Sequence, residues 1–335
     1  MNKTALIIGA NGQDASYMAE FLIEKGYNVH GTIRRNSVPE SQTTRIEHLR
    51  SQDLITLHYM DLTDPISVES IINEIKPDEI YHLAAQSHVQ ISFDLPKYTL
   101  DVNGGGTLSV LEAVRKFSPK SKIYHAATSE MFGNSFDDDK FQRETTPLTP
   151  VSPYGCSKLY AHSLCHNYRN AYDMFICSGI LFNHESPRRG INFVTNKVVL
   201  EAVKIKLGLS DELVLGNLGA MRDWGHAKDY VKGMWLMLQQ DQPDDYVLAT
   251  GESKSVGDLV NYVFDKLDLD SKKYVKTDAK FERAEELHYL RGDSSKARTK
   301  LGWEPEYTFE TMLDEMIEYW MTLLTKQNNI VWAAY

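Results

Sequence analysis

Cysteine is scarce in this chain of 335 residues, which has only Cys156, Cys165 and Cys177. An odd, scattered set excludes a disulfide framework and a cysteine metal site, so we expect no metal and reduced thiols in a cytoplasmic protein. Long apolar runs are also missing. None approaches the roughly 20 residues of a membrane helix, and the run over residues 5–10 is too short for a secretory signal. We therefore expect no membrane partner.

Positive charge is in deficit as well. Lys and Arg number 36 against 46 Asp and Glu, a net charge of −10, which argues against a nucleic-acid partner. Repeats and low-complexity tracts are absent, and 42% hydrophobic residues suffice for a large core, which excludes wholesale disorder. The one run of charges, residues 137–140, is expected to be a solvated loop.

The first half of the chain alternates β-branched runs with helical patterns. We predict strands at 4–8, 28–33, 56–60, 79–83, 122–127 and 174–181, and helices at 16–25, 65–75, 98–117 and 153–172. This alternation predicts right-handed βαβ units and an α/β fold with a Rossmann-type doubly wound parallel sheet, which binds ligands at the carboxyl ends of its strands.

After residue 182 the alternation stops, and short strands at 213–215 and 246–249 are expected to be isolated. We predict three regions: a dinucleotide-binding Rossmann domain over 1–182, a smaller mixed α/β substrate-binding lobe over 183–325 with possible returns to the sheet, and a loose polar tail over 326–335. Because no clean linker separates the first two, we expect them to share one cleft.

A glycine-rich turn directly follows the first predicted strand. Residues 9–15 read GANGQDA, the pattern GxxGxxA, and open a helix. Glycine lets the backbone approach a pyrophosphate, which rests at the positive N-terminus of the helix. An ordinary βα turn is the alternative, but the position in the first βα unit favours a cofactor site. Its predicted residues are Gly9, Asn11, Gly12, Gln13 and Asp14.

The second strand ends in Arg34, Arg35, Asn36 and Ser37, where an NAD site would place Asp or Glu against the ribose 2′-hydroxyl. Two arginines and a serine suit a 2′-phosphate, so NADP is favoured over NAD, and over a merely solvated pair of arginines. Residues after the third and fourth strands are placed to meet the adenine, ribose and nicotinamide. They are Asp61, Leu62, Leu83, Ala84, Ala85, Gln86 and Ser87.

Four residues form a candidate catalytic set. Tyr154 and Lys158 lie four apart in a predicted helix and so share a face, where the ammonium is expected to lower the pKa of the phenol. On an extended fifth strand, Thr128 and Glu130 would also share a face, with Ser129 pointing away. A hydroxyl there can hold a substrate oxygen and a carboxylate can remove a carbon-bound proton. An exposed strand end is the alternative for Glu130.

These motifs resemble the extended short-chain dehydrogenase/reductase superfamily. Four further stretches, 83–89, 179–190, 193–197 and 222–230, closely resemble its GDP-mannose 4,6-dehydratase family, and the resemblance spans residues 1 to about 320. It implies a hydro-lyase that converts GDP-mannose to GDP-4-keto-6-deoxymannose by internal hydride transfer through NADP and loss of water. It also implies a homodimer or homotetramer, because the family's arginine-bearing loop reaches a neighbouring subunit's cofactor.

The resemblance also implies roles for single residues. Thr128, Glu130 and Tyr154 match catalytic residues, and Lys158 matches a lysine that orients the cofactor. Matches to further cofactor contacts are Tyr98, His184 and Arg189. Matches to GDP-sugar contacts are Ser87, Asn183, Val194, Lys197, Arg222, Arg283 and Glu286.

Some alternatives stay open at this point. Asn196 and Ala284 replace an arginine and a proline that are usual in the family, so another GDP-sugar, such as a GDP-manno-heptose, is conceivable. An NADP-dependent sugar-nucleotide reductase or epimerase would share the glycine turn and the Tyr/Lys pair without requiring Glu130. A catalytically silent NADP-binding regulatory protein would need none of the four catalytic residues.

Overall fold

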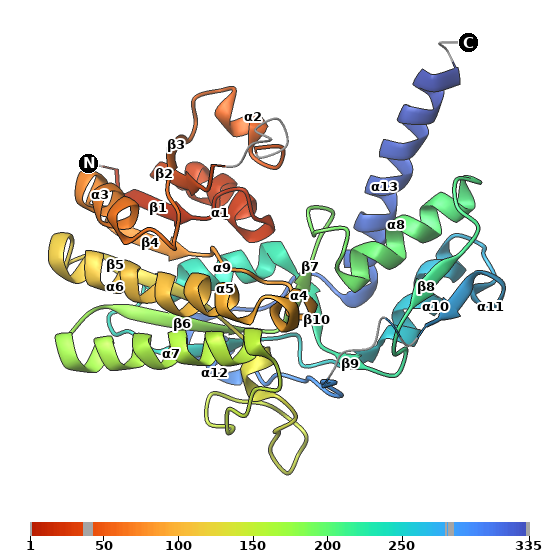
Figure 1. The fold of residues 1–335 in the computed structure, drawn as a ribbon. Helices are drawn as coiled ribbons and strands as arrows, with labels where there is room; N and C mark the ends of the chain where they lie inside the picture. The colour runs from red at the N-terminus through yellow and green to blue at the C-terminus, as the bar shows by residue number, and fades with distance from the viewer. Residues whose placement is uncertain (1, 36–42, 279, 281–284, 333–335) are drawn as a thin grey trace.

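A seven-stranded parallel sheet forms the larger part of the molecule (Figure 1). The computed structural model describes residues 2–35, 43–278, 280 and 285–332. The strand order is β11-β6-β5-β4-β1-β2-β3, and every neighbouring pair is parallel. The strands are β1 (Thr4–Ile8), β2 (Asn28–Ile33), β3 (Thr56–Tyr59), β4 (Glu79–His82), β5 (Lys122–Thr128), β6 (Ile176–Leu181) and β11 (Asp245–Leu248). The predicted α/β fold with a Rossmann-type doubly wound sheet is confirmed.

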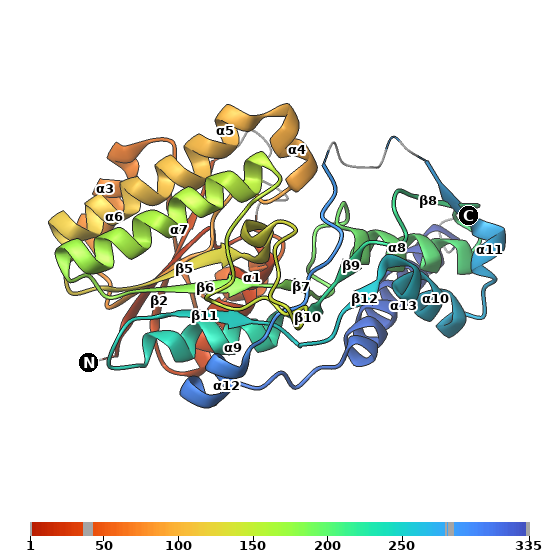
Figure 2. The same cartoon turned by 90° about the horizontal axis from the view of Figure 1, so that it is seen from below.

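Helices cover both faces of this sheet (Figure 2). One face packs against α3 (Pro65–Ile75), α6 (Gly106–Phe117) and α7 (Pro153–Tyr172), and the other against α1 (Gln13–Glu24), α9 (Ala227–Leu238) and α12 (Ser295–Leu301). Strand β1 shows why both faces are buried: Ala5 and Ile7 join the core beneath α1 and α9, whereas Leu6 and Ile8 join the core beneath α3 and α6. A strand buried on both sides is apolar throughout, as in parallel sheets generally.

The helix predicted over 98–117 is three consecutive pieces. These are α5 (Pro96–Leu100), a π-helical turn η2 (Asp101–Gly105) and α6. The π turn positions the buried Asn103, whose side chain bonds both the N–H and the C=O of Gln86 and donates to Ser157 on α7. The turn therefore fixes the loop after β4 against α7. Short helices α2 (Glu47–Arg50) and α4 (Val89–Asp94) flank this region.

Strand β11 corrects one prediction. The strand expected at 246–249 is not isolated, because β11 pairs in parallel with β6 and becomes the edge strand of the main sheet. Helix α9, just before β11, packs on α1. Helix α12, later in the chain, packs against β11 and α9. Sequence alone does not reveal this pairing, since a parallel edge strand finds its partner far away along the chain.

A smaller group of elements lies beside the sheet domain (Figure 1). Three two-stranded sheets pair β7 (Asn183–Glu185) with β10 (Trp224–His226), β9 (Met221–Arg222) with β12 (Lys254–Ser255), and β8 (Leu213–Leu215) with β13 (Val275–Thr277). The helices are α8 (Val194–Lys206), α10 (Val256–Lys266), α11 (Ser271–Tyr274) and α13 (Phe309–Trp332). Their apolar faces build a separate core from residues such as Val199, Leu259, Phe264 and Met316.

Helix α13 differs from the expected loose tail, because it continues through residues 326–332 and projects from the body of the molecule (Figure 1). Lys and Gln are good helix formers, so polar composition by itself does not end a helix. No helix in the described ranges is long and apolar enough to cross a membrane.

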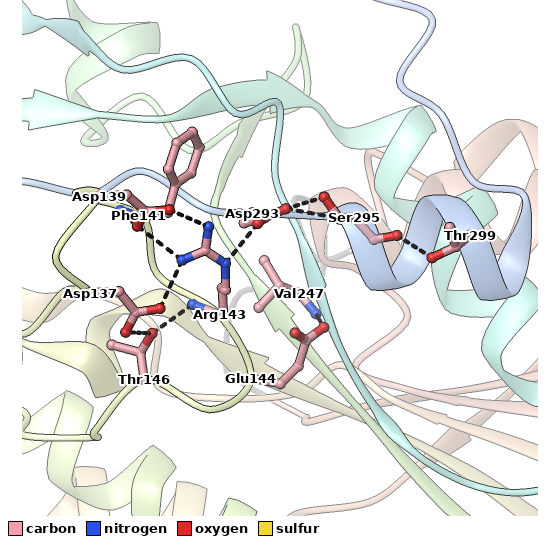
Figure 3. Close-up of polar contacts among 10 residues, drawn as sticks. All are labelled: Asp137, Asp139, Phe141, Arg143, Glu144, Thr146, Val247, Asp293, Ser295 and Thr299. Atoms are coloured by element: carbon pink, nitrogen blue, oxygen red, sulfur yellow. Dashed lines mark hydrogen bonds and ion pairs between the residues drawn. The ribbon is translucent and has the colours of Figure 1, made fainter.

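The loop between β5 and α7 is braced by charge (Figure 3). The guanidinium of Arg143 donates to Asp137 at 2.9 Å, to Asp139 at 2.6 Å and to Asp293 at 2.7 Å. The carboxylate of Glu144 accepts the N–H of Val247 on the edge strand β11 at 2.8 Å. The run 137–140, expected to be only solvated, is therefore tied to the chain that returns to the sheet.

Gly133 begins this loop with φ +56, and a Cβ built there would lie 1.9 Å from the carbonyl oxygen of Thr149. Replacing Gly133 with Ala should therefore cost about 3 kcal/mol or more of unfolding free energy. Gly26→Ala is the matched control, because its φ is also positive (+80) but nothing lies within 4 Å of the new Cβ. That change should cost about 1 kcal/mol. Equal losses in chemical denaturation would contradict the steric account.

Candidate active site

A cavity of about 1130 Å³ lies at the carboxyl ends of the central strands and extends along α8. It brings together all four candidate catalytic residues and most of the predicted binding residues. The predicted residues that line it are Gly9, Asn11, Gly12, Gln13, Asp14, Arg34, Asp61, Leu62, Leu83, Ala84, Ala85, Ser87, Tyr98, Thr128, Glu130, Tyr154, Lys158, Asn183, His184, Arg189, Val194, Lys197, Arg222 and Glu286.

Two predicted cofactor residues do not line the cavity. The guanidinium of Arg35 lies over the ring of Tyr59, 5.5 Å from its centroid. The side chain of Gln86 accepts the N–H of His88 at 2.6 Å and donates to Thr99, so it shapes its own loop. Four other residues named from the sequence lie outside the described residues: Asn36, Ser37, Arg283 and Ala284.

The glycine turn is tighter than expected. Helix α1 begins at Gln13, one turn before the predicted start, with Gly12 as its N-cap. Gly9 has φ +89, and a Cβ there would lie 2.8 Å from the Cβ of Ala84. Glycine therefore lets the loop pass against the end of β4, and the N-terminus of α1 opens onto the cavity. This geometry suits a pyrophosphate.

An ion pair joins this turn to the smaller lobe. His184, on β7, places Nε2 2.8 Å from the Asp14 carboxylate and Nδ1 2.7 Å from the carbonyl of Phe182. Burial alone would lower the pKa of His184 and raise that of Asp14, but their mutual attraction outweighs burial. The pKa of His184 is raised and that of Asp14 is lowered, so the contact favours the charged form of both groups. Gln13 adds a bond to the carbonyl of His184.

The Tyr/Lys pair lies at the start of α7. Ser152 caps the helix by accepting the N–H of Gly155, so Tyr154 and Lys158 fall in its first two turns and are buried. Burial raises the pKa of Tyr154 to about 12 and lowers that of Lys158 to about 8. The Lys158 ammonium donates to the carbonyl of Ala126 at 2.9 Å. In the chain by itself, the expected lowering of the tyrosine pKa is therefore wrong, because desolvation dominates.

Thr128 and Glu130 meet the cavity for a different reason from the predicted one. Strand β5 ends at Thr128, and residues Ser129–Phe132 form a 3-10 turn, η3. The Thr128 hydroxyl accepts the N–H of Glu130 at 3.2 Å. Alternation along a strand therefore does not apply, and Ser129, expected to point away, also lines the cavity. Glu130 is only 8% exposed, so its carboxylate is largely desolvated.

The segment after β7 closes one side of the cavity. The Arg189 guanidinium lies 3.1 Å from the Glu185 carboxylate and stacks 3.7 Å from the ring centroid of Phe193. Asn196 is fully buried and bridges the Arg189 carbonyl to the indole of Trp320 on α13. Asn196 braces this segment and does not line the cavity. Its replacement of the usual arginine therefore says nothing directly about the sugar.

Comparison with known proteins decides the family. The family model described as GDP-mannose 4,6 dehydratase matches residues 6–316. GDP-mannose 4,6 dehydratase 2 of Arabidopsis thaliana is 50% identical over 343 residues, an alignment that covers 99% of this chain and 91% of the relative. The chain belongs to the GDP-mannose 4,6-dehydratase family. Membership of this family implies a nucleotide cofactor, and the Gly9–Asp14 turn offers a place for it.

Solved structures agree on the fold. UDP-glucose 4-epimerase of Thermotoga maritima, with UDP-glucose, superposes with a TM-score of 0.84 at 24% identity, covering 96% of this chain and 99% of that one. dTDP-glucose 4,6-dehydratase of Bacillus anthracis, in complex with NAD, gives 0.82 at 22% identity, covering 96% and 97%. Across the described part of the chain, no group of three His, Cys, Asp or Glu side chains is arranged to hold a metal.

The far end of the cavity holds residues that neither the motifs nor the resemblance to the dehydratase family indicated. Among them are Ile191, Asn192, Glu201, Lys204, Asn217 and Lys280. Two of these had a signal in the sequence. Glu201 and Lys204 follow Lys197 by four and seven residues, which places all three on one face of α8. The others come from loops, where spacing predicts no shared face.

The Asp14–His184 pair predicts a pH-dependent stability. Because the pKa of His184 is raised on folding, its charged form stabilises the fold fully below the ordinary pKa of 6.5. This stabilisation is lost as the pH rises through the raised pKa. Because the pKa of Asp14 is lowered on folding, its carboxylate stabilises the fold above its ordinary pKa of 3.8. This stabilisation is lost as the pH falls through the lowered pKa. Asp14→Asn should therefore cost about 1–3 kcal/mol near pH 6 and clearly less near pH 9.

Urea unfolding of both proteins at the two pH values measures this difference. Asp258→Asn is the matched control, because Asp258 also occupies the first turn of a helix and has a lowered pKa, but its partners are backbone and hydroxyl groups of Ser255. Its cost should be the same at pH 6 and pH 9. An equal cost of Asp14→Asn at both values would show that the imidazolium contributes nothing.

Proposed function

We propose that this chain is a GDP-mannose 4,6-dehydratase that uses NADP and forms GDP-4-keto-6-deoxymannose with loss of water. The observation that supports this most directly is the shared cavity of Thr128, Glu130, Tyr154 and Lys158 beside the glycine turn. A base for a hydroxyl proton and a separate carboxylate for a carbon-bound proton stand together there. A simple reductase or epimerase needs only the first.

The residues around the turn fit a dinucleotide. Small side chains at Ala84 and Ala85 leave room for a flat ligand, and Gly9 allows close backbone approach. Arg34 lines the cavity and donates to the Tyr98 hydroxyl, and a guanidinium at this edge of the cavity suits a ribose 2′-phosphate. NADP held by Gly9, Arg34 and the N-terminus of α1 would supply a reversible hydride acceptor, as an internal transfer from sugar C4 to C6 requires.

The chain's own residues move the protons. The Tyr154 phenol takes the proton of the C4 hydroxyl, and the Thr128 hydroxyl donates to the resulting keto oxygen. The 4-ketone acidifies the C5 hydrogen, which the Glu130 carboxylate removes. One of the two protonated groups, Glu130 or Tyr154, then gives its proton to the departing C6 hydroxyl, which leaves as water. The other protonated group returns its proton to C5 when C6 regains a hydride, so both residues end as they began. Because burial holds the tyrosine pKa near 12 in the chain alone, a cation must stabilise the phenolate, and Lys158 is one turn away.

The remaining predicted residues suit the GDP portion. Lys197 lines the cavity and its ammonium donates to the carbonyl of Val214 at 2.7 Å, and Arg222 lies 3.4 Å from the Glu286 carboxylate. Lys and Arg bind diphosphate oxygens, and a carboxylate accepts hydrogen bonds from a ribose or a guanine. GDP-mannose is the proposed sugar nucleotide, because the matching family model and the Arabidopsis relative carry its name. Asn196 lies away from the cavity and gives no reason to prefer another sugar.

We also infer a homodimer or homotetramer. Large apolar side chains are exposed on α5 and α7: Leu100 is 44% and Tyr160 45% exposed, and both approach Gly104. A second copy of the chain would remove this apolar surface from water. Cytoplasmic location stays a prediction.

Arg34 predicts the choice of cofactor. Arg34→Ala should lower the ratio of NADP to NAD affinity by about tenfold or more, because charge-assisted bonds to the 2′-phosphate are lost. The protein without bound cofactor is titrated with NADPH and with NADH. Nicotinamide fluorescence then gives both dissociation constants. Arg35→Ala is the control and should change the ratio less than about threefold, since Arg35 faces Tyr59. An unchanged ratio in Arg34→Ala would contradict the assignment.

Glu130 predicts the course of the reaction. The protein, incubated with GDP-mannose and catalytic NADP⁺, should give a product lighter by one water without accumulating NADPH, as followed by mass spectrometry and absorbance. Glu130→Gln should slow turnover about 10²–10⁴-fold and leave the NADP affinity unchanged.

Glu144→Gln is the matched control, because this carboxylate is also in the β5–α7 loop but bonds β11 and does not line the cavity. It should keep nearly full turnover. Full turnover by Glu130→Gln would disprove the role of Glu130. A product of unchanged mass, or net consumption of NADPH, would instead support an epimerase or a reductase.

A further inference from the structure

The position of the substrate's base follows from the layout of the cavity. The glycine turn follows β1, the four catalytic residues come from the end of β5 and the start of α7, and the lining also includes α8 as far as Lys204. A GDP-sugar whose hexose reacts beside the catalytic residues is therefore expected to extend its nucleoside along α8. This helix rises about 15 Å from Val194 to Lys204. The inference below rests on the proposed function, since it takes a GDP-sugar as the substrate.

Both apolar and charged side chains line the cavity near α8. Leu215, Ala220 and Val256 line it and offer flat contact to the faces of a base. Polar groups on α8 stand beside them. Glu201 and Lys204 both line the cavity, and the ammonium of Lys204 donates to Oε1 of Glu201 at 2.7 Å. Their side chains are only 24% and 33% exposed, so the pair is not a fully solvated surface contact.

Two further lysines line the cavity with this pair. Lys197 lies one turn before Glu201 on α8, and Lys280 faces the same end from the other side of the cavity. Burial lowers the pKa of Lys197; the Glu201 carboxylate opposes this shift, and the Lys280 ammonium adds to it. Lys280 is paired with Asp278 at 2.8 Å, as Lys204 is with Glu201 at 2.7 Å, so both of these lysines have a carboxylate partner. Glu201 lines the cavity, where a carboxylate is unfavourable for binding only a diphosphate because it repels phosphate oxygens. It suits a ligand group that carries hydrogen-bond donors next to an acceptor.

The Watson–Crick edge of guanine has this pattern. N1–H and the N2 amino group are adjacent donors, and O6 beside them is an acceptor. A carboxylate accepts from two neighbouring donors, and an ammonium donates to a carbonyl. We propose that Glu201 and Lys204 of α8 read the guanine base, with Glu201 accepting from N1–H and N2–H and Lys204 donating to O6. Glu201 is then the residue that distinguishes guanine from bases without the amino group.

The alternative is an ordinary helix pair. Glu and Lys at i,i+3 contribute about 0.2–0.5 kcal/mol to a helix and need no ligand. The two accounts differ in one respect that can be measured. A structural pair affects all nucleotide sugars alike, whereas a guanine-reading carboxylate affects only substrates that have the 2-amino group.

Inosine diphosphate mannose provides the test, because hypoxanthine keeps O6 and N1–H but lacks the 2-amino group. Wild-type protein should prefer GDP-mannose over IDP-mannose in kcat/KM by about tenfold or more. Glu201→Ala should bring that ratio to within about threefold, mainly through a higher KM for GDP-mannose with kcat little changed, because the contact is the same in ground and transition states. Lys204→Met should weaken both substrates alike, since both have O6.

Arg115→Gln is the matched control. Arg115 forms an i,i+3 pair with Glu112 on α6, at 2.7 Å and outside the cavity, so its loss should leave the ratio at the wild-type value. A ratio retained in Glu201→Ala would overturn the proposal and leave the pair as a helix contact. Glu201→Gln and the dissociation constants of GDP and IDP provide a second measurement. That binding ratio still tests the proposal if GDP-mannose is not turned over, a result that would instead overturn the proposed function.

Discussion

The buried ion pair between Asp14 and His184 holds the two parts of this molecule in one geometry. Asp14 stands in the first turn of α1, at the cofactor turn, and His184 stands on β7, where the chain leaves the sheet. Ser186 adds a bond to the side chain of Gln13 at 2.8 Å. These contacts join residues about 170 apart in the chain, so they hold the cofactor turn against the segment that begins the smaller lobe. A cofactor and a sugar react efficiently only when both are held in a defined relative position.

Desolvation is the second consequence of this closure. The same burial that makes the Asp14–His184 pair strong raises the pKa of Tyr154 and lowers that of Lys158. In the proposed reaction an unassisted phenol with a pKa near 12 is a poor proton acceptor at neutral pH, so the site depends on positive charge brought close to it. Lys158 loses part of its own charge near pH 8, which links the tyrosine's reactivity to the protonation of its neighbour.

The central strands and helices of the sheet were predicted well from the sequence, whereas its edge strand β11 and the turn after β5 were not. Strands β1 and β2 and helices α3 and α7 have the predicted bounds, because each has clear turn or capping residues at its ends, such as Ser152 and Gly26. Strand β11 was misplaced because its partner β6 lies more than sixty residues earlier. The turn at Ser129 was missed because nothing in the letters TSE distinguishes a strand end from a 3-10 turn. Glu130 still lines the cavity, but it does so from a 3-10 turn, where the alternation of side chains along a strand does not apply.

The binding end shows a similar division. Resemblance indicated Lys197 and Arg222, and both line the cavity, whereas Glu201 and Lys204 depend on which face of α8 turns inward. That face is set by packing against α10 and α13, which the local sequence does not contain.

Net charge was also a poor guide to the site. The described residues that line the cavity include seven Lys and Arg and six Asp and Glu, although the whole chain has a charge of −10. An acidic exterior repels polyanions in general, while a cavity near neutrality with paired charges can bind two nucleotides by hydrogen bonds of defined direction. Selectivity in such a cavity comes from where each carboxylate stands, because every acidic group placed near a phosphate weakens binding unless a ligand donor meets it.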